Sequence, residues 1–358
     1  MNVLLVTSIY LPHIGGIELY VKNLAVHLLK RNCNVTIFVG DRFVKSFSEK
    51  FEGNIKIIRC PVFYIKGMTY LKNKYQYYIL KQELSKADIV HLNDIKFLYK
   101  YLAVNKKYFS YKLFFSSHGF IFHTKSFAFL KKIYMCYMQK YSSSYDINYC
   151  VSDSDYSIAE KFKFHNIKKL IPGVDINKFK SLDTGNAIVN NFLYWGRISR
   201  NKGVLRLVEL FNNLDFDYTL NLIGVCDDEI LLKNINSIIS ENSKINLLGY
   251  KDDTELEKYI QEAEFLLFPS LYEGFGMSLI EGISSGKKII ANTIPTYKEI
   301  LSQCNMLVNL FDFSNDADSL LATIKNLKTI GMVVPNLYNF SIEYMVDIIY
   351  YDYLKHKG

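Results

Sequence analysis

The sequence has no Cys-x-x-Cys pair; its six cysteines are scattered, at Cys33, Cys60, Cys136, Cys150, Cys226 and Cys304. This argues against a disulfide scaffold or a structural zinc site and suits a reducing compartment. No apolar run approaches the roughly 18 residues of a membrane span. No basic segment precedes the first apolar residues, so a secretory signal is not expected. We expect a cytoplasmic globular protein, whose 358 residues make about two domains.

Positive charge is concentrated in the first half of the chain. Residues 1–175 hold 26 Lys and Arg against 12 Asp and Glu, whereas the remainder holds 17 against 23. A basic half beside an acidic half indicates an anionic partner, such as nucleic acid, an anionic membrane or a phosphorylated substrate. Lysines interleaved with aromatics at 63–78 and 127–141 fit a membrane surface or base stacking. A solvated lysine-rich face is the alternative, and for 127–141 we favour core packing.

Strand-like and helix-like runs alternate along the chain, which is typical of parallel sheets covered by helices. Before residue 170, strands are expected at Asn2–Thr7, Asn34–Val39, Ile55–Ile58, Ala87–Leu92, Lys112–Phe115 and Ile147–Val151, with a first helix after Gly16. After residue 190, strands are expected at Phe192–Trp195, Thr219–Ile223, Ile245–Leu247, Phe265–Phe268, Lys288–Ala291 and Asn305–Val308. The later helices are expected at Val204–Phe211, Glu229–Ile239, Asp253–Ala263, Met277–Ser285, Asp316–Asn326 and Ser341–Lys357. The sequence therefore predicts an α/β protein of two doubly wound domains facing a cleft, joined within Ile171–Leu182.

The strongest motif is FPSLYEGFGMSLIEG, from Phe268 to Gly282. It places glycines between an apolar strand and a helix, where free backbone N–H groups and the helix dipole favour a diphosphate. Glu281, about one turn into that helix, could accept hydrogen bonds from a ribose diol. A capped helix with a solvated Glu281 is the alternative.

A second motif, GRISRNKG, follows the strand that ends at Trp195. Its Arg197 can hold phosphate oxygens through two hydrogen bonds, and its Lys202 adds a point charge. Together they could neutralise a leaving diphosphate. An ordinary basic loop is the alternative.

Two weaker signals follow strands of the first half. Gly15 and Gly16 would let the backbone approach a ligand, but without GxGxxG spacing they also fit a simple tight turn. His118, in the sequence SSHG, sits at a strand's carboxyl end, where ligands collect, although a lone histidine is commonly structural.

Several acidic residues look like metal ligands but have a simpler explanation. Asp153 and Asp155 form an Asp-x-Asp pair, which Ser152 or Asp153 acting as a helix N-cap explains better. The run Asp227–Glu229 likewise looks like a helix start. No histidine has metal-ligand spacing, so no metal site is expected.

In order along the chain, these motifs are similar to those of the retaining glycosyltransferases of family 4, which have the GT-B fold. The resemblance rests on Gly15–Gly16, His118–Gly119, the GVD…F junction at Gly173–Phe179, GR…KG, and the E-x7-E pair Glu273 and Glu281. Pro172, where many relatives carry Asn, is one departure. The resemblance implies an acceptor-binding domain at 1–172, a nucleotide-sugar-binding domain at 173–335, and a tail helix at 336–358 that returns to the first domain.

Residue by residue, the resemblance assigns roles in binding and transfer. Arg197 and Lys202 would bind the donor diphosphate, Glu281 the ribose and Glu273 the donor sugar. His118 would lie near the reacting carbon. The remaining donor contacts would come from Gly15, Gly16, Tyr250 and the backbone of Gly274, Phe275, Gly276, Met277, Ser278 and Leu279. No metal and no cofactor beyond the nucleotide-sugar co-substrate is implied.

The expected function is therefore retaining transfer of a hexose or N-acetylhexosamine from a nucleotide-diphosphate sugar. A UDP-sugar is favoured and GDP-mannose comes next. The expected acceptor is a glycan or lipid-diphosphate-linked sugar of a bacterial surface polysaccharide such as O-antigen or lipopolysaccharide. Peripheral contact with an anionic membrane stays open, and nucleic acid is not expected. The alternative is a non-catalytic GT-B subunit of a polysaccharide assembly complex.

Overall fold

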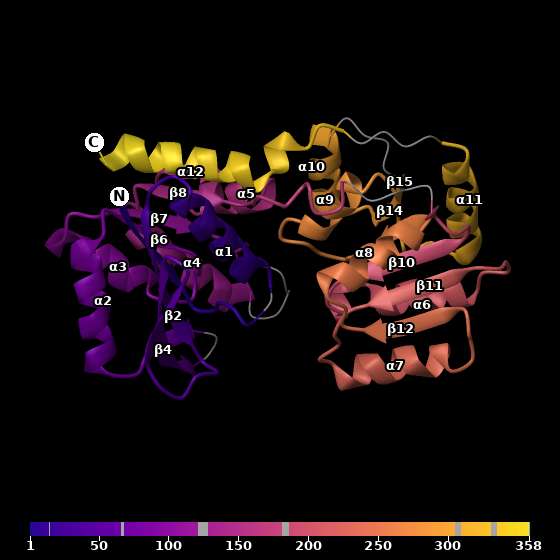
Figure 1. The fold of residues 1–358 in the computed structure, drawn as a ribbon, viewed down its shortest axis with the longest axis horizontal. Helices are drawn as coiled ribbons and strands as arrows, with labels where there is room; N and C mark the ends of the chain where they lie inside the picture. Colours follow the sequence, from indigo (N-terminus) through magenta and orange to yellow (C-terminus); the bar gives the residue numbers. More distant parts are fainter. Residues whose placement is uncertain are drawn as a thin grey trace. The chain divides into compact units, whose positions relative to one another are not determined.

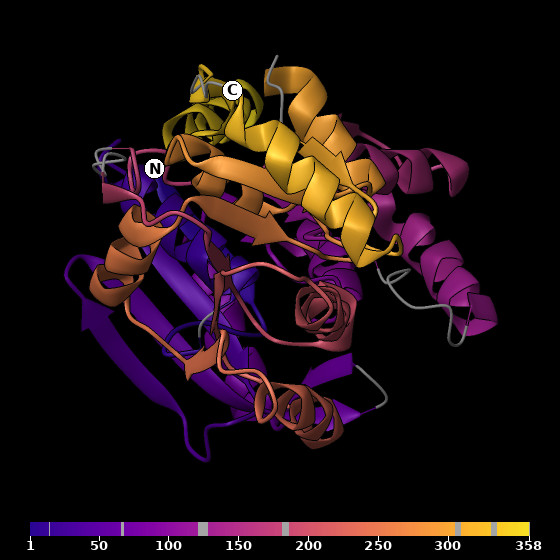
Figure 2. The same ribbon diagram turned by 90° about the vertical axis from the view of Figure 1, so that its right-hand side faces the viewer.

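The chain folds into two compact units. The computed structural model describes residues 1–13, 15–65, 68–120, 128–180, 186–304, 309–330 and 335–357. Unit 1 comprises Met1–Gly173 and Ser341–Gly358, and unit 2 comprises Val174–Phe340. Helices flank the sheet of each unit (Figure 1 and Figure 2). Within the described ranges, no helix is long and apolar enough to cross a membrane.

Unit 1 is built on a largely parallel sheet with the strand order β3-β4-β2-β1-β6-β7-β8-β9, to which β5 is added beside β4. Its strands are β1 (Asn2–Thr7), β2 (Asn34–Asp41), β3 (Ser48–Glu52), β4 (Ile55–Ile65), β5 (Met68–Leu71), β6 (Ile89–Leu92), β7 (Lys112–Ser116), β8 (Ile147–Cys150) and β9 (Ile167–Lys169). Only β3 and β5 run antiparallel, both against β4. β1 is central, and its residues from Val3 to Val6 are all apolar and buried because helices cover both of its faces.

Successive side chains of β1 enter two different cores. Leu4 and Val6 pack on the face of α2 (Lys74–Lys86), α3 (Tyr99–Asn105) and α4 (Ala128–Ser142). Val3 and Leu5 pack on the face of α1 (Gly16–Leu29) and α12 (Ile342–Lys357). This alternation is what a strand's two-residue period produces. The remaining helices of unit 1 are α5 (Asp153–Lys161) and the short 3-10 helix η1 (Lys106–Tyr108).

The tail helix α12, yellow in Figure 1, belongs to unit 1. Its buried residues recur every three or four positions, so one face of the helix enters the core beside α1: Ile342, Met345, Val346, Ile349, Asp352 and Tyr353. Asp352 is buried with two partners, because it accepts hydrogen bonds from Tyr149 Oη at 2.8 Å and from Lys168 Nζ at 2.7 Å.

Unit 2 has a fully parallel sheet with the order β12-β11-β10-β13-β14-β15. Its strands are β10 (Asn191–Trp195), β11 (Thr219–Ile223), β12 (Ile245–Gly249), β13 (Phe265–Phe268), β14 (Lys288–Asn292) and β15 (Asn309–Phe311). Its helices are α6 (Val204–Asn212), α7 (Glu229–Ile239), α8 (Asp253–Glu262), α9 (Met277–Ser284), α10 (Pro295–Cys304) and α11 (Ala317–Lys328), with 3-10 turns η4 (Arg200–Lys202) and η5 (Tyr338–Phe340).

Most of the strands and helices expected from the sequence are confirmed to within a few residues. The pattern gave no strand at β3, β5, β9 or β15 and no helix at α10, and β4 extends seven residues beyond the expected Ile55–Ile58. The strand expected at Asn305–Val308 lies outside the described residues. Core packing of 127–141, the favoured alternative, is confirmed for the face of α4 that buries Met135 and Met138, whereas Phe129, Ile133 and Tyr137 are exposed.

Each sheet has a point where the chain reverses the direction in which strands are added. In unit 1 this point lies between β1 and β6, and in unit 2 it lies between β10 and β13. Ligands of doubly wound sheets bind at the carboxyl ends of the strands that flank such a point. A ligand-binding site is therefore expected in the loops that follow these four strands.

Candidate active site

In unit 2, the two predicted motifs occupy the loops that flank the strand reversal. GRISRNKG leaves the end of β10, and the loop from Pro269 to Gly276 leaves the end of the neighbouring β13. The loops bond directly, because the backbone N–H of Leu271 donates to the carbonyl of Asn201 at 2.8 Å. Two motifs about 70 residues apart in sequence thus form one surface.

Gly203 is what lets these loops approach so closely. Its φ is +68°, and a Cβ built on it would lie 2.2 Å from the carbonyl oxygen of Pro269. A side chain there would meet both a strained left-handed backbone and a backbone clash. The glycine that ends the GRISRNKG motif is therefore explained by packing against the second loop.

Lys202 and Glu273 form an ion pair across the two loops. The Lys202 ammonium lies 2.6 Å from Glu273 Oε1, with side chains only 20% and 11% exposed. The same oxygen accepts hydrogen bonds from Ser270 Oγ at 2.7 Å and Tyr297 Oη at 3.3 Å. The resemblance implies a different part of the donor for each of the two charges, and nothing in the structure tests those roles. The pairing with each other fixes both groups in one geometry.

Glu281 projects from α9 beside Trp195. Burial raises the pKa of Glu281, and the nearby charges of Asp253 and Asp175 also raise it. Lys178 and a hydrogen bond with Trp195 act in the opposite direction. The next residue, Gly282, lets α9 pack on the strand ends, because a Cβ there would lie 2.7 Å from the Phe268 ring.

Arg197 lies on the loop that leaves the end of β10. It is exposed and makes no ion pair with the carboxylates of the described residues, while its carbonyl accepts a hydrogen bond from Tyr194 Oη at 2.9 Å. Tyr250, which follows β12, is also exposed. Both side chains are therefore accessible to a solute at this edge of the sheet.

The start of α9 adds backbone donors to the same edge. Gly276 is its N-cap, with φ of +89° and no side-chain cap, and Leu279 N–H already bonds the Gly276 carbonyl at 3.0 Å. An α-helix leaves its first N–H groups without intrahelical partners. Those of Met277 and Ser278 are thus the ones oriented to receive an anion, while Gly274 and the buried Phe275 complete the loop before them.

In unit 1, Gly15 and Gly16 begin α1, which follows β1. Gly15 is the N-cap in an extended conformation, and the Glu18 carboxylate lies 2.7 Å from where its Cβ would be. One turn further along α1, the ring of Tyr20 meets the ring of His118 edge-on at 4.4 Å. The structure therefore brings the glycine pair and His118 to the same side of the unit 1 sheet.

His118 is a neutral imidazole in this environment. Burial lowers its pKa to about 3. Its Nε2 is buried and makes no hydrogen bond with the described residues. Buried polar atoms nearly always have partners, so this nitrogen is a candidate contact for a hydroxyl of a bound sugar.

A buried hydrogen-bond chain lies behind His118. Ser116 Oγ contacts Tyr20 Oη at 3.2 Å and His91 Nε2 at 2.8 Å, and His91 Nδ1 contacts Tyr353 Oη at 2.5 Å. Burial lowers the pKa of His91 to about 3. The chain connects α1, β6, β7 and α12 beneath the His118 loop.

Asp155 holds the His118 loop from the other side. Its carboxylate accepts three hydrogen bonds: from Ser117 Oγ at 2.6 Å, Gly119 N–H at 3.1 Å and Phe120 N–H at 2.9 Å. His118 between them has φ of +49°, a left-handed conformation uncommon for any residue but glycine. Ser152 is the N-cap of α5, as one of the two expected alternatives had it.

Sequence reasoning missed the residues that support the site. Ser270, Thr296 and Tyr297 hold Glu273 and its carbonyl, and two of them lie in the unpredicted helix α10. A signal existed for Tyr297, since a buried tyrosine oxygen needs a polar partner. Asp228 is the N-cap of α7, as expected. In the described part of the chain, no group of three or more His, Cys, Asp or Glu could hold a metal ion.

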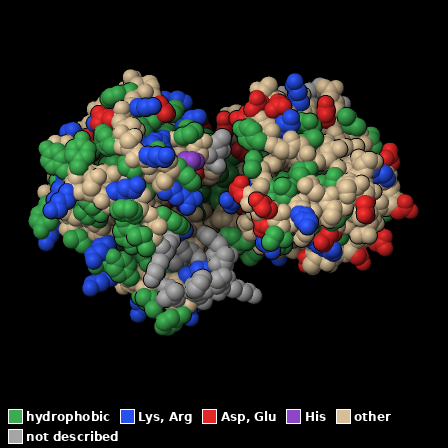
Figure 3. Space-filling view, turned by 90° about the horizontal axis from the view of Figure 1, so that it is seen from below, with side chains coloured by type: hydrophobic (Ala, Val, Ile, Leu, Met, Phe, Trp, Pro, Cys, Tyr) green, Lys and Arg blue, Asp and Glu red, His purple; other side chains and the backbone are tan. Residues whose placement is uncertain are grey.

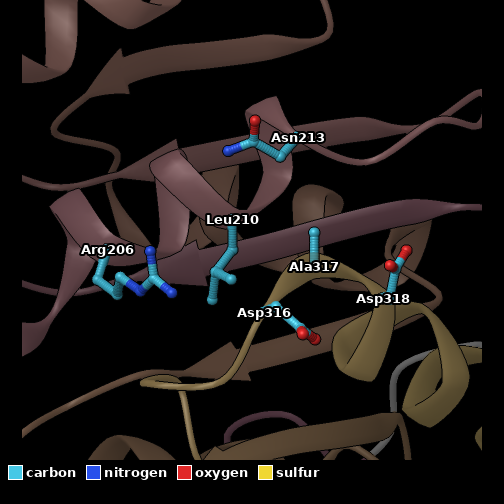
Figure 4. Close-up of a pocket in the computed structure, with 6 residues that line it drawn as sticks. All are labelled: Arg206, Leu210, Asn213, Asp316, Ala317 and Asp318. Atoms are coloured by element: carbon cyan, nitrogen blue, oxygen red, sulfur yellow. The ribbon is translucent and has the colours of Figure 1, made fainter.

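One surface pocket of unit 2 lies away from these residues. It is lined by Arg206, Leu210 and Asn213 of α6 and by Asp316, Ala317 and Asp318 at the start of α11 (Figure 4). The Arg206 guanidinium donates to the carbonyls of Phe313 and Asn315 at 3.0 and 2.8 Å. Its donors are thus largely used to hold the loop before α11, and none of the predicted site residues lines this pocket.

Comparison with known proteins gives the same class that the fold and the two motifs define. The family described as Glycosyltransferase Family 4 matches residues 14–178, and that described as Glycosyl transferases group 1 matches residues 183–331. This chain belongs to glycosyltransferase family 4 and has the GT-B fold.

Two curated relatives and one solved structure illustrate the similarity. GDP-mannose:cellobiosyl-diphosphopolyprenol alpha-mannosyltransferase of Xanthomonas oryzae pv. oryzae is 26% identical, over 90% of this chain and 87% of the relative. The protein of that name from Xanthomonas campestris is 28% identical over 66% of this chain, and the match spans less than two thirds of that relative, 64%. Anabaena Alr3699/HepE, solved in complex with UDP and glucose, has a TM-score of 0.75 at 14% identity, covering 99% and 100% of the two chains.

Proposed function

We propose that this glycosyltransferase transfers a hexose from a nucleotide-diphosphate sugar, with retention of configuration, to a growing lipid-linked bacterial surface polysaccharide. The observation that carries the proposal is the surface at β10 and β13, where the Lys202–Glu273 pair, the exposed Arg197 and the first N–H groups of α9 gather at one edge of the sheet. These groups suit a diphosphate and the sugar attached to it.

For the donor, we propose GDP-mannose ahead of a UDP-sugar, which reverses the preference drawn from the sequence. The support is the name of the Xanthomonas relatives, which specifies GDP-mannose. At 14% sequence identity, the Anabaena structure with UDP supports the fold alone and does not bear on the choice of donor. We propose that Glu281 binds the ribose with either donor, because both nucleotides carry the same ribose hydroxyls.

The chemical task is to stabilise negative charge as the bond between the anomeric carbon and the diphosphate breaks. Preorganised donors aimed at developing charge usually contribute more to such catalysis than any other single effect. We assign this role to Arg197, to Lys202 and to the backbone N–H groups at the start of α9. With same-face attack, the departing phosphate accepts the proton of the acceptor hydroxyl, so no strong general base is needed from the chain.

From unit 1 we propose that His118 contacts the donor sugar near its reacting carbon and that Gly15 and Gly16 admit the diphosphate. A neutral imidazole with an unpaired buried nitrogen supports a hydrogen bond to a sugar hydroxyl. Tyr250 would lie beside the base. The proposed acceptor, a lipid-diphosphate-linked glycan, follows the diphosphopolyprenol in the name of the relatives.

The test is a binding and hydrolysis screen with GDP-mannose and with UDP-, ADP- and dTDP-sugars, each with and without EDTA. We expect tight binding of GDP-mannose that EDTA does not weaken and that Glu281→Ala abolishes. Arg197→Ala should lower the transfer rate about a hundred- to a thousandfold. The matched control is Arg200→Ala, three residues along the same loop, where the arginine is paired with Asp228 instead.

Two results would contradict the proposal. A loss of less than about fivefold in Arg197→Ala, or equal losses in Arg197→Ala and Arg200→Ala, would remove Arg197 from the leaving-group role. Failure to bind any nucleotide sugar would favour a non-catalytic subunit of an assembly complex.

A further inference from the structure

The outward face of α4 and the adjoining end of α3 carry an unusual combination of residues. On α4, Phe129, Ile133 and Tyr137 are 74%, 51% and 39% exposed. They recur at the three- and four-residue spacing of one helix face, which α4 turns away from the buried Met135 and Met138. Large apolar side chains gathered on one exposed face mark an interaction site more often than isolated ones do.

Lysines surround this face, and neither α3 nor α4 carries an Asp or a Glu. Lys132 and Lys140 are exposed on the same side of α4. Lys100 of α3 lies over the rings of Tyr137 and Tyr141, at 5.9 and 5.8 Å from their centroids. The whole segment from residue 95 to residue 145 contains nine Lys, no Arg, no Asp and no Glu. We call the exposed residues Lys100, Val104, Phe129, Lys132, Ile133, Tyr137 and Lys140 the α3–α4 face.

We propose that the α3–α4 face docks on the surface of an anionic lipid bilayer. An interfacial helix buries its apolar side about 5–10 Å into the boundary between headgroups and acyl chains while its lysines reach the phosphates. Each lysine near an anionic leaflet adds about a fivefold gain in partitioning. The face presents both components, an apolar stripe and a cationic border.

The charge pattern argues against other occupants. Two copies of this chain meeting through the same face would bring like charges together, and neither α3 nor α4 carries a carboxylate to pair with them. Nucleic-acid contacts rely heavily on Arg, which the segment lacks. The contrast between the units is visible in Figure 3, where Lys and Arg mix with hydrophobic side chains on unit 1 and Asp and Glu are frequent on unit 2.

The first test is sedimentation with vesicles of phosphatidylcholine alone and of phosphatidylcholine with about one third phosphatidylglycerol, without nucleotide sugar. We expect binding to the anionic vesicles only, weakened as salt shortens the Debye length from about 10 Å to about 3 Å. Phe129→Ser/Ile133→Ser should lower the partition coefficient about tenfold or more, and Lys132→Gln/Lys140→Gln should lower it about 25-fold. Ile230→Ser is the matched control, an isoleucine 66% exposed on α7 beside acidic residues, and should bind like the unchanged protein.

A second readout reports which face touches the lipid. Cys136 is exposed on the same side of α4, whereas the other cysteines are buried or half-buried. With Cys226 replaced by Ser, an environment-sensitive fluorophore on Cys136 should shift to shorter wavelength when anionic vesicles are added. No shift, or equal binding of Phe129→Ser/Ile133→Ser and the unchanged protein, would overturn the proposal, as would dimerisation that these substitutions abolish. Because no nucleotide sugar is present, this test fails or succeeds independently of the proposed transfer reaction.

Discussion

Replacing Asp155 by Asn tests whether the loop that carries His118 is held by a single carboxylate. Asp155 Oδ2 accepts from Ser117 Oγ and Gly119 N–H, and Oδ1 accepts from Phe120 N–H. The substitution keeps the volume but leaves one acceptor oxygen. If that oxygen retains the first two bonds, the new amide N–H faces the N–H of Phe120, a donor against a donor.

The expected loss of stability follows from the one hydrogen bond, that of the Phe120 N–H, which the substitution removes. One buried donor left unsatisfied destabilises a protein by about 1–3 kcal/mol, which for a unit of this size lowers Tm by about 2–4 °C per kcal/mol. Loosening the left-handed turn at His118 also displaces its ring, and a misplacement of about 1 Å can lower a rate a hundredfold. We expect Asp155→Asn to lower kcat for transfer by about tenfold or more at temperatures where the variant is fully folded.

The assay is a double-mutant cycle with His118→Ala, combining thermal melts and steady-state transfer kinetics. If Asp155 acts through His118, its substitution should lower kcat in the parent but hardly at all in His118→Ala. Asp153→Asn is the control, because that carboxylate lies two residues away and is exposed. A variant that loses stability but keeps its full kcat would refute the positioning role, and equal effects in both backgrounds would do so too.

Three further predictions concern stability. Gly203→Ala should destabilise the protein by about 1–2 kcal/mol from its left-handed backbone alone, and by more because its Cβ meets Pro269; thermal melts and nucleotide titration of the variant measure both effects. In urea unfolding, the double variant Lys202→Met/Glu273→Gln should lose about 1 kcal/mol less free energy of unfolding than the two single variants lose in sum. Strict additivity would mean that the ion pair contributes nothing to stability. Burial raises the pKa of Asp94 from 3.8 to about 6. At a pH between these two values, the carboxyl group is therefore protonated in the folded state but ionised in the unfolded state. Stability should therefore fall by up to about 3 kcal/mol as pH rises through that window, and urea unfolding of Asp94→Asn should show this dependence removed.

The sequence predicted the elements that are buried on both faces. β13 reads FLLF and β1 reads NVLLVT, and such continuous apolar runs between turns are typical of central parallel strands. β3, SEKFE, was missed because it is an edge strand whose residues are largely exposed, so no core imposes a pattern on it. α10 was missed although it supplies Tyr297 to the site.

The same limit applies to the candidate site. The loops with Arg197, Lys202 and Glu273 could be located because glycines and charges follow apolar strands. That Lys202 pairs with Glu273 could not be predicted, because 71 residues separate them and only the strand order β10-β13 brings them together. The role of Asp155 was hidden for the same reason, since its local pattern also fits an ordinary helix start.

The tail helix α12 has a consequence for how the chain is made. Five apolar side chains of residues 342–353 complete the core on one face of the unit 1 sheet, and Tyr353 supplies the phenol that contacts His91. During synthesis, residues 1–173 leave the ribosome long before this helix exists, and unit 2 is translated in between. One apolar face of unit 1 therefore stays uncovered until α12 has been synthesised. Unit 2 is contiguous in sequence and can finish folding before that. Loss of the last twenty or so (~20) residues would accordingly leave the exposed core of unit 1 as a target for chaperones and proteases, although every residue assigned to donor binding would remain.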